Sequence, residues 1–331
     1  MNQENFFLNL DQLHLSASAF KLLLESPKQY YEDYVLGNKE VKKGKHFDEG
    51  SLVHCMVLEA HNVNEKFVNM GVPVPSDNTK ACIDRLLSLE TESDDLDQYH
   101  DEILDYLREV NLHQSLVDDK KSPFVTGDSK RLGKIITDSS KEYFRLMVIS
   151  RTKVIVDENS WSRCQDKADA IIANPLAFRL LRETDEGDQL RYELELKSRH
   201  ENFKYGLKGI LDVIKVSKKD KTIYISDVKT TAALLKDFTK SVDAYDYWLQ
   251  GAIYKLLALA MLGGKIYDYK IVFHFIVVDR NNDVYCFNVS EATMELWMIQ
   301  LEELINTKIN YHIENKDFTL PYEFANNLIS L

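Results

Sequence analysis

The sequence predicts an α/β (α+β) protein in which helices flank a mixed central sheet. Apolar residues repeat with a helical period in residues 16–59 and again near the C-terminus, whereas residues 190–230 show the two-residue period of β-strands. The patterns follow the order helices, three consecutive strands, a helix, two strands and a helix. Such an order is typical of a sheet that packs against helices around one hydrophobic core.

The N-terminal part of the chain is expected to be helical. Between residues 16 and 36 the apolar positions fit a helical period that Pro27 interrupts, which predicts two short helices. Residues 50–59 (GSLVHCMVLE) form another apolar helix. From about 73 to 153 the composition becomes polar, and residues 90–109 contain nine acidic side chains. We interpret this stretch as an acidic, mainly helical insertion.

Strands dominate the centre of the chain. Residues 160–183 predict two helices separated by Pro175. Apolar and charged residues then alternate over residues 192–197, and two further strands follow at about 205–216 and 222–229. The short turns between these segments predict a three-stranded meander.

The C-terminal part completes the sheet and its cover of helices. A strongly apolar helix is expected over about 244–262, followed by strands at 269–278 and 284–289. A hairpin turn at residues 281–282 joins these two strands, and a long helix over about 291–313 closes the fold.

We expect three segments along the chain. Residues 1–72 are a helical part that carries a histidine-containing helix, residues 73–155 are the acidic insertion, and residues 156–331 are the strand-rich core. No internal repeat is evident.

Composition and charge limit the class of protein. The chain has 331 residues, of which 44% are hydrophobic, and 41 Lys and Arg against 53 Asp and Glu give a net charge of −12. This acidic balance argues against broad, nonspecific nucleic-acid binding, which needs clustered Lys and Arg, but it leaves room for a local basic groove.

The sequence also predicts the compartment. No apolar run approaches the roughly 20 residues that span a bilayer, and the first residues lack the features of a signal peptide. We therefore expect a cytoplasmic protein without a membrane partner. Four cysteines match no zinc or iron–sulfur spacing and are expected to be reduced thiols: Cys55, Cys82, Cys164 and Cys286.

The most informative segment is residues 209–230. Asp212 lies in one predicted strand, and Asp227 and Lys229 lie in the next. Residues two apart in a strand share a face at a spacing of about 6.6 Å, so the carboxylate of Asp227 and the ammonium of Lys229 should project together. Two carboxylates can bind a hard cation such as Mg²⁺, and a cation with a lysine beside it can support phosphodiester hydrolysis. Taken alone, the pattern is more typical of a surface salt bridge than of a metal site.

Together with neighbouring motifs, this segment resembles the PD-(D/E)XK nuclease superfamily, and more closely its RecB-like branch and the exonuclease VIII (RecE-type) family of phages and prophages. Residues 13–31 (LHLSASAFKLLLESPKQYY) are similar to the opening of that family, and GSLVHCMVLE is similar to its histidine motif. Gln250 and Tyr254 match its Q-x-x-x-Y motif, while Leu211 replaces its proline. The resemblance spans most of the chain and implies a restriction-endonuclease-like core.

The resemblance also implies roles for individual residues. The implied metal ligands are His54, Asp212, Asp227 and the backbone carbonyl of Val228. The implied catalytic residues are Asp212, Asp227, Lys229 and Glu193. Glu195 shares a strand face with Glu193, so either could reach the metal, although the spacing favours Glu193. Lys229 would position or deprotonate the attacking water.

Four further residues are expected to contact DNA or support the active site: Gln250, Tyr254, Ser16 and Ser18. Each site residue also has an ordinary structural interpretation. Ser16 is a natural helix N-cap, His54 could be a core histidine, and Gln250 could be a polar position on an amphipathic helix.

The function that the resemblance implies is a Mg²⁺-dependent exodeoxyribonuclease, with Mn²⁺ as an alternative ion and no iron–sulfur cluster, because the C-terminal cysteine trio of cluster-bearing relatives is missing. It would digest linear duplex DNA from 5′ to 3′ in a phage or bacterial host cell. The 3′ single strands would pass to a strand-annealing recombination protein, and the enzyme would form a homo-oligomeric ring. Two alternatives stay open: a nuclease for single-stranded or flap DNA in repair or defence, and a noncatalytic DNA-binding protein that retains the nuclease fold.

Overall fold

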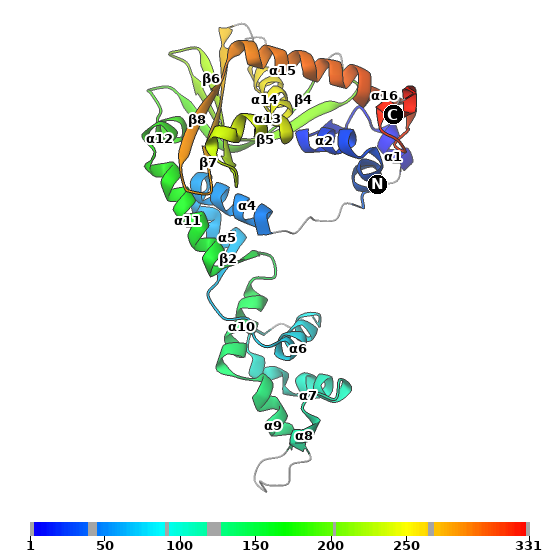
Figure 1. Ribbon diagram of the computed structural model, residues 1–331, viewed down its shortest axis with the longest axis vertical. Helices are drawn as coiled ribbons and strands as arrows, with labels where there is room; N and C mark the ends of the chain where they lie inside the picture. The colour runs from blue at the N-terminus through cyan, green and yellow to red at the C-terminus, as the bar shows by residue number, and fades with distance from the viewer. Residues whose placement is uncertain are drawn as a thin grey trace. The chain divides into compact units, whose positions relative to one another are not determined.

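The computed structural model describes residues 3–38, 45–89, 93–117, 127–200, 203–263 and 268–328. The chain divides into two units, the first formed by residues 1–60 and 165–331 and the second by residues 61–164. The first unit contains a mixed sheet flanked by helices (Figure 1), so the predicted α/β class is confirmed.

The described part of the first unit contains a six-stranded sheet with the order β1-β5-β6-β7-β8, in which β4 also pairs with β5. Its strands are β1 (His14–Leu15), β4 (Gln189–Arg199), β5 (Gly206–Ser217), β6 (Thr222–Thr230), β7 (Lys270–Val278) and β8 (Val284–Val289). The predicted meander is present, because β4, β5 and β6 pair antiparallel in sequence. Strand β7 then joins β6 in parallel and forms the predicted hairpin with β8. Strand β1, only two residues long, was not predicted.

Strands β5 and β6 separate part-way along their length. They pair only from Val213↔Ser226 to Ser217↔Thr222. Beyond Ser226, β6 continues along β7, whereas the first residues of β5 pair with β1 at His14↔Gly206. We call the point beyond Val213 and Ser226, where the two strands part, the strand fork.

Helices cover both faces of the sheet. The helices of the first unit are α1 (Gln3–Leu8), α2 (Ala17–Glu25), α3 (Pro27–Tyr30), α4 (Lys45–Leu58), α12 (Pro175–Arg182), α13 (Phe238–Ala244), α14 (Tyr247–Leu262), α15 (Glu291–Leu304), α16 (Asn310–Asn315) and α17 (Tyr322–Asn326). Ile225 and Phe275 share one core with α14 and α15. Val228 and Ile276 are also buried, and they point to the opposite face of the sheet because side chains alternate along a strand. Helices α4 and α12 contact β6 and β8 respectively.

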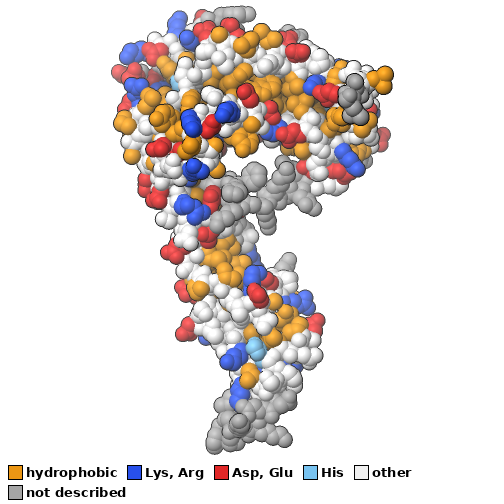
Figure 2. All heavy atoms as spheres, viewed as in Figure 1, with side chains coloured by type: hydrophobic (Ala, Val, Ile, Leu, Met, Phe, Trp, Pro, Cys, Tyr) orange, Lys and Arg blue, Asp and Glu red, His pale blue; other side chains and the backbone are white. Residues whose placement is uncertain are grey.

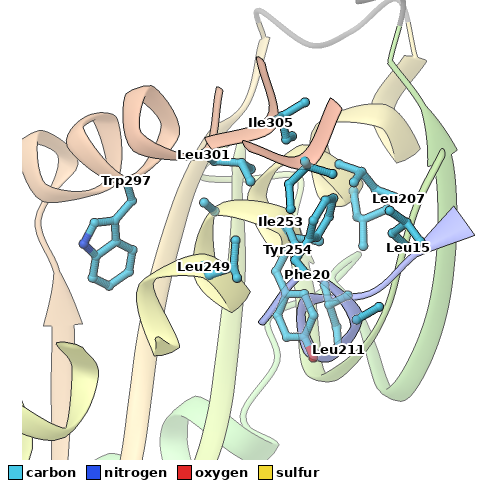
Figure 3. Close-up of a cluster of buried hydrophobic side chains, with 14 of the residues drawn as sticks. Leu15, Phe20, Leu207, Leu211, Leu249, Ile253, Tyr254, Trp297, Leu301 and Ile305 are labelled. Carbon is cyan, nitrogen blue, oxygen red and sulfur yellow. The ribbon is translucent and has the colours of Figure 1, made fainter. Parts of the chain in front are cut away.

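The largest core lies between the sheet and α2, α14 and α15. Leu207 and Leu211 of β5 pack with Leu249 and Ile253 of α14, as Figure 3 shows. Helix α14 comes so close to β5 that a Cβ on Gly209 would lie 2.7 Å from the Tyr254 ring. Burial of this apolar surface therefore fixes α14 against the strand that carries Asp212.

The predicted helix over 244–262 is wrong in one respect. Helix α13 ends at Ala244 and α14 begins at Tyr247, because Asp246 has a left-handed backbone with φ of 52°. A left-handed residue cannot continue a right-handed helix. The predicted closing helix continues instead through a π-helical turn, Ile305–Ile309, into α16.

The second unit has its own core. Its elements are α5 (Val63–Lys66), β2 (Phe67–Met70), α6 (Asp77–Leu87), α7 (His100–Glu109), α8 (Gln114–Val117), α9 (Gly127–Ile135), α10 (Asp138–Ile149) and β3 (Val154–Asp157), and α11 (Glu158–Ala173) contains the sequence boundary to the first unit. Strands β2 and β3 form a parallel pair that was not predicted. Arg131 is buried and donates to the carbonyls of Leu107 and Leu112, which ties α9 to the end of α7.

No described helix of either unit is long and apolar enough to cross a membrane.

Candidate active site

Acidic residues of three neighbouring strands meet at the strand fork. In the β4–β5 ladder, Tyr192 pairs with Val213 and Leu194 with Leu211, so Glu193 lies opposite Asp212. Asp227 follows Ser226, the last residue of β6 that pairs with β5. Residues at facing positions of adjacent strands have neighbouring side chains. The register therefore brings Glu193 and Asp212 together and places Asp227 nearby.

Glu193 also departs from ordinary strand geometry. Its φ is 47°, and the ladder has no pair at the Glu193–Asp212 position. For a residue other than glycine, a left-handed conformation is uncommon in a strand and tends to occur at functional sites. Glu195, the alternative in the sequence, instead lies 2.6 Å from the ammonium of Lys197 and is exposed.

Helix α4 adds His54 to this acidic pair. Ligand atoms of His54, Glu193 and Asp212 all lie within 4.8 Å of one another. The Nε2 atom of His54 lies 2.5 Å from the carbonyl oxygen of Val228. Since a carbonyl can only accept, Nε2 carries a hydrogen, and Nδ1 faces Oδ2 of Asp212 at 3.5 Å.

This arrangement fits a divalent cation. An imidazole nitrogen and two carboxylates converge on one place, where a bound cation would offset the repulsion between the carboxylates. Carboxylate oxygens suit Mg²⁺ and Mn²⁺, and an imidazole nitrogen suits transition metals. Of the implied ligands, His54 and Asp212 belong to this group. Asp227 does not belong to it, and the Val228 carbonyl accepts the hydrogen bond of His54.

Asp227 pairs with Lys229 instead. The Asp227 side chain is fully buried, and the Nζ of Lys229 lies 2.5 Å from its Oδ2. Burial raises the pKa of Asp227 to about 6, against the opposing effect of the Lys229 charge. Burial acts to lower the pKa of Lys229, but the carboxylates of Asp227 and Asp212 outweigh it, so this pKa is raised. Lys229 is therefore an ammonium ion at neutral pH.

A chain of hydrogen bonds fixes Lys229 from the side of α14. Its Nζ donates to Oε1 of Gln250 at 3.0 Å, and Nε2 of Gln250 donates to the hydroxyl of Tyr254 at 2.8 Å. That hydroxyl donates to the carbonyl of Ile210 at 2.5 Å. These hydrogen bonds form together only if the Gln250 amide points its oxygen at Lys229 and its nitrogen at Tyr254. The network therefore fixes the orientation of this amide. The ammonium also lies 4.9 Å from the centre of the Tyr247 ring, a cation–π distance.

Next to Lys229 lies a cleft of about 570 Å³. Its lining includes all four residues predicted to contact DNA or support the site: Ser16, Ser18, Gln250 and Tyr254. Ser16 is the N-cap of α2, which confirms its structural interpretation, and its contact with DNA stays a prediction. The cleft connects to strand β6 through Gln250 and Tyr247, which both contact Lys229.

The cleft contains residues that sequence reasoning missed, namely Lys21, Lys208, Tyr245 and Tyr247. Tyr247 stands three residues before Gln250, so helical spacing could have placed it on the same face. Tyr245 gave no such signal, because its position depends on the break at Asp246.

A sequence comparison identifies the family. A sequence model described as the PD-(D/E)XK nuclease superfamily matches residues 14–318. The chain belongs to this superfamily. One solved structure, from Eubacterium rectale and named "Putative exonuclease", is 12% identical; the match covers 100% of this chain and 95% of that one, with a TM-score of 0.44. No curated protein matches the sequence.

Membership in the PD-(D/E)XK nuclease superfamily gives the site its chemistry. Members are nucleases that use divalent metals. The group of His54, Glu193 and Asp212 supplies ligands of the required kind within the residues matched by the family.

Proposed function

We propose that this PD-(D/E)XK nuclease is an exodeoxyribonuclease. The observation that carries the proposal is the convergence of a metal-binding group, His54, Glu193 and Asp212, with the buried Asp227–Lys229 pair at one strand fork. A noncatalytic DNA-binding protein would need neither the buried ion pair nor the converging acceptors, both of which oppose stability without a ligand.

The proposed roles follow from the contacts of each residue. Asp212, Glu193 and Nδ1 of His54 hold the ion. A bound divalent metal polarises a phosphate oxygen and lowers the pKa of a bound water. Lys229 is held as an ammonium ion by Asp227 and Gln250, so it cannot accept a proton. We therefore assign it to stabilising negative charge on the phosphate and positioning the water, in preference to deprotonation. Asp227 keeps that charge in place.

We further propose the finer properties that the RecE-type resemblance implies. These are Mg²⁺ or Mn²⁺ as the ion, 5′ to 3′ digestion of linear duplex DNA, and delivery of 3′ single strands to a strand-annealing recombination protein. The chain carries a net charge of −12, and Figure 2 shows acidic and basic side chains interspersed on the displayed face. Contacts to DNA should therefore be concentrated near the cleft. A homo-oligomeric ring belongs to the same proposal, and light scattering of the purified protein tests it.

Digestion of an end-labelled duplex tests the proposed function. A linear duplex labelled separately at each 5′ and 3′ end is incubated with wild type, Asp212→Asn or Lys229→Ala, in Mg²⁺, Mn²⁺ or EDTA. We expect metal-dependent loss of the 5′ label, reduced by about 10²-fold or more in both variants. The matched control is Asp105→Asn, since Asp105 is 77% exposed and lies in the second unit. Intact DNA with every ion, or equal rates for wild type and Lys229→Ala, would contradict the proposal. Cleavage of single-stranded or flap DNA alone would favour the alternative nuclease.

A further inference from the structure

The cleft beside Lys229 has an aromatic wall. Tyr245 and Tyr247 both line it, and their ring centres lie 5.7 Å apart with an interplanar angle of 33°. Tyr245 is 58% exposed, whereas Tyr247 is partly buried against Lys229. Lys21 Nζ lies 5.9 Å from the centre of the Tyr245 ring, and the exposed part of this ring offers a flat apolar surface to a ligand.

The backbone is shaped so that both rings reach the cleft. Two residues of a continuous helix separated by two positions point in widely different directions. The left-handed Asp246 between them ends α13 and starts α14, which allows the two rings to lie side by side. The indole Nε1 of Trp248 donates to Oδ1 of Asp246 at 3.2 Å, and Lys21 lies 3.4 Å from its Oδ2. Two side chains thus hold the strained residue in place, as is common at ligand-binding sites.

Size and charge restrict what the cleft can bind. Its volume of about 570 Å³ is that of a small-ligand pocket and is large enough for one nucleotide. The charged residues of its lining are Lys21 and Lys208 against Glu195 and Asp246, so the positive charges are balanced. Recognition in this cleft must therefore come mainly from stacking and hydrogen bonds.

On this basis, and resting on the proposed nuclease function, we propose that Tyr245 and Tyr247 form a stacking platform for one unpaired base of the DNA strand being cut. The base belongs to a nucleotide next to the cleaved phosphodiester, because Tyr247 and Gln250 contact Lys229. Both faces of a base inside a duplex are stacked on its neighbours, so a side chain can reach a face only at an unpaired nucleotide or at a strand end. The platform thus makes the enzyme specific for strand ends that are unpaired or can open.

Binding without cleavage tests the platform separately from catalysis. The probe is a ten-nucleotide DNA strand with a terminal 2-aminopurine, whose fluorescence falls when it stacks, titrated with protein in EDTA. We expect quenching with wild type and with Tyr245→Phe, which keeps the ring. For Tyr245→Ala we expect the quenching to be lost and Kd to rise about tenfold, the usual effect of removing one stacking partner. The same rise should persist from 50 to 200 mM salt, since stacking is not ionic.

The matched control is Tyr285→Ala. Tyr285 lies on β8 outside the cleft lining, and its exposed fraction of 59% is close to the 58% of Tyr245. This variant should bind and quench like wild type. Unchanged Kd and quenching in Tyr245→Ala, or an equal loss in Tyr285→Ala, would overturn the platform. Because Tyr245 is exposed, Tyr245→Ala should melt at the wild-type temperature.

A kinetic measurement separates this inference from the proposed function. With wild type, a duplex end carrying three unpaired nucleotides should have a lower KM than a fully paired end. Tyr245→Ala should raise KM for the unpaired end about tenfold and leave kcat unchanged. Quenching without any cleavage would retain the platform and reject the nuclease function. Cleavage without quenching would reject the platform alone.

Discussion

Removing one carboxylate from the metal-binding group should make the metal-free protein more stable. Ligand atoms of Glu193 and Asp212 lie within 4.8 Å of each other. At that distance, two negative charges repel by about 3.5 kcal/mol for an effective dielectric constant of about 20. Glu193 is partly exposed, so solvent screens part of this energy. We therefore expect Glu193→Gln to raise the free energy of unfolding by about 1–2 kcal/mol in EDTA, which is about 2–8 °C in Tm for a domain of this size.

Bound metal should reverse the order of the melting temperatures of wild type and Glu193→Gln. An ion at 100 times its Kd stabilises the folded wild type by about 2.7 kcal/mol, provided that it binds only the folded state. Glu193→Gln lacks one charged ligand and should gain much less. Wild type should therefore melt below Glu193→Gln in EDTA and above it in saturating Mn²⁺ or Mg²⁺.

Thermal unfolding by calorimetry, with and without the ion, measures both effects. The control is Glu295→Gln, which removes an exposed carboxylate from α15 and should change neither Tm nor the response to metal. The reasoning fails if Glu193→Gln melts at or below wild type in EDTA and gains as much as wild type from the ion. That result would mean that Glu193 is neither a source of repulsion nor a ligand.

Three further predictions concern other parts of the fold. Gln250→Leu leaves the ammonium of Lys229 without its amide acceptor, so the single-turnover cleavage rate should fall about 10- to 100-fold with Tm retained; an unchanged rate would remove Gln250 from the site. Burial lowers the pKa of His274 to about 4. Between about pH 6.5 and pH 4, the imidazole is therefore protonated in the unfolded chain and neutral in the folded chain. Stability should therefore decline by up to about 3 kcal/mol between pH 6.5 and 4 in urea titrations, and His274→Phe should abolish that part of the decline. Gly209→Ala places a Cβ 2.7 Å from the Tyr254 ring, so urea unfolding should show a loss of about 1–3 kcal/mol; a wild-type midpoint would show that α14 can move away.

Local patterns predicted the elements of the first unit well. The alternation of apolar and charged residues located β4, the two strand-like segments that follow it located β5 and β6, and the turns between them predicted their antiparallel order. The two-residue spacing of a strand also placed Asp227 and Lys229 on one face. In the structure, Nζ of Lys229 lies 2.5 Å from Oδ2 of Asp227. These features depend on neighbours in the sequence, which is why a single sequence can reveal them.

Features that depend on distant contacts were beyond the sequence. The strand fork requires β1, and two residues cannot display a period. The left-handed backbone of Asp246 was not predicted, because one of the two side chains that hold this residue, Lys21, is distant in the sequence. Glu193 lies with Asp212 and His54, whereas Asp227 pairs with Lys229. This arrangement depends on the register of three strands and on the position of α4, which local patterns do not reveal. That Asp212 and Asp227 share one ion, as their places in adjacent strands suggested, stays a prediction.

The strand fork explains why the site residues are held so firmly. Where β5 leaves β6, the edge of β6 that faced β5 loses its ladder partners, and unpaired backbone groups are unfavourable in a buried place. The N–H of Val228 donates to Oδ2 of Asp212 at 2.7 Å, and its carbonyl accepts from His54 at 2.5 Å. Two side chains of the metal-binding group thus replace the missing strand partner. The same bonds that satisfy the backbone orient the carboxylate and fix the tautomer of the imidazole, so Nδ1 is free to bind an ion. In this protein the opening of the sheet creates the space for the site and also supplies the hydrogen bonds that build it.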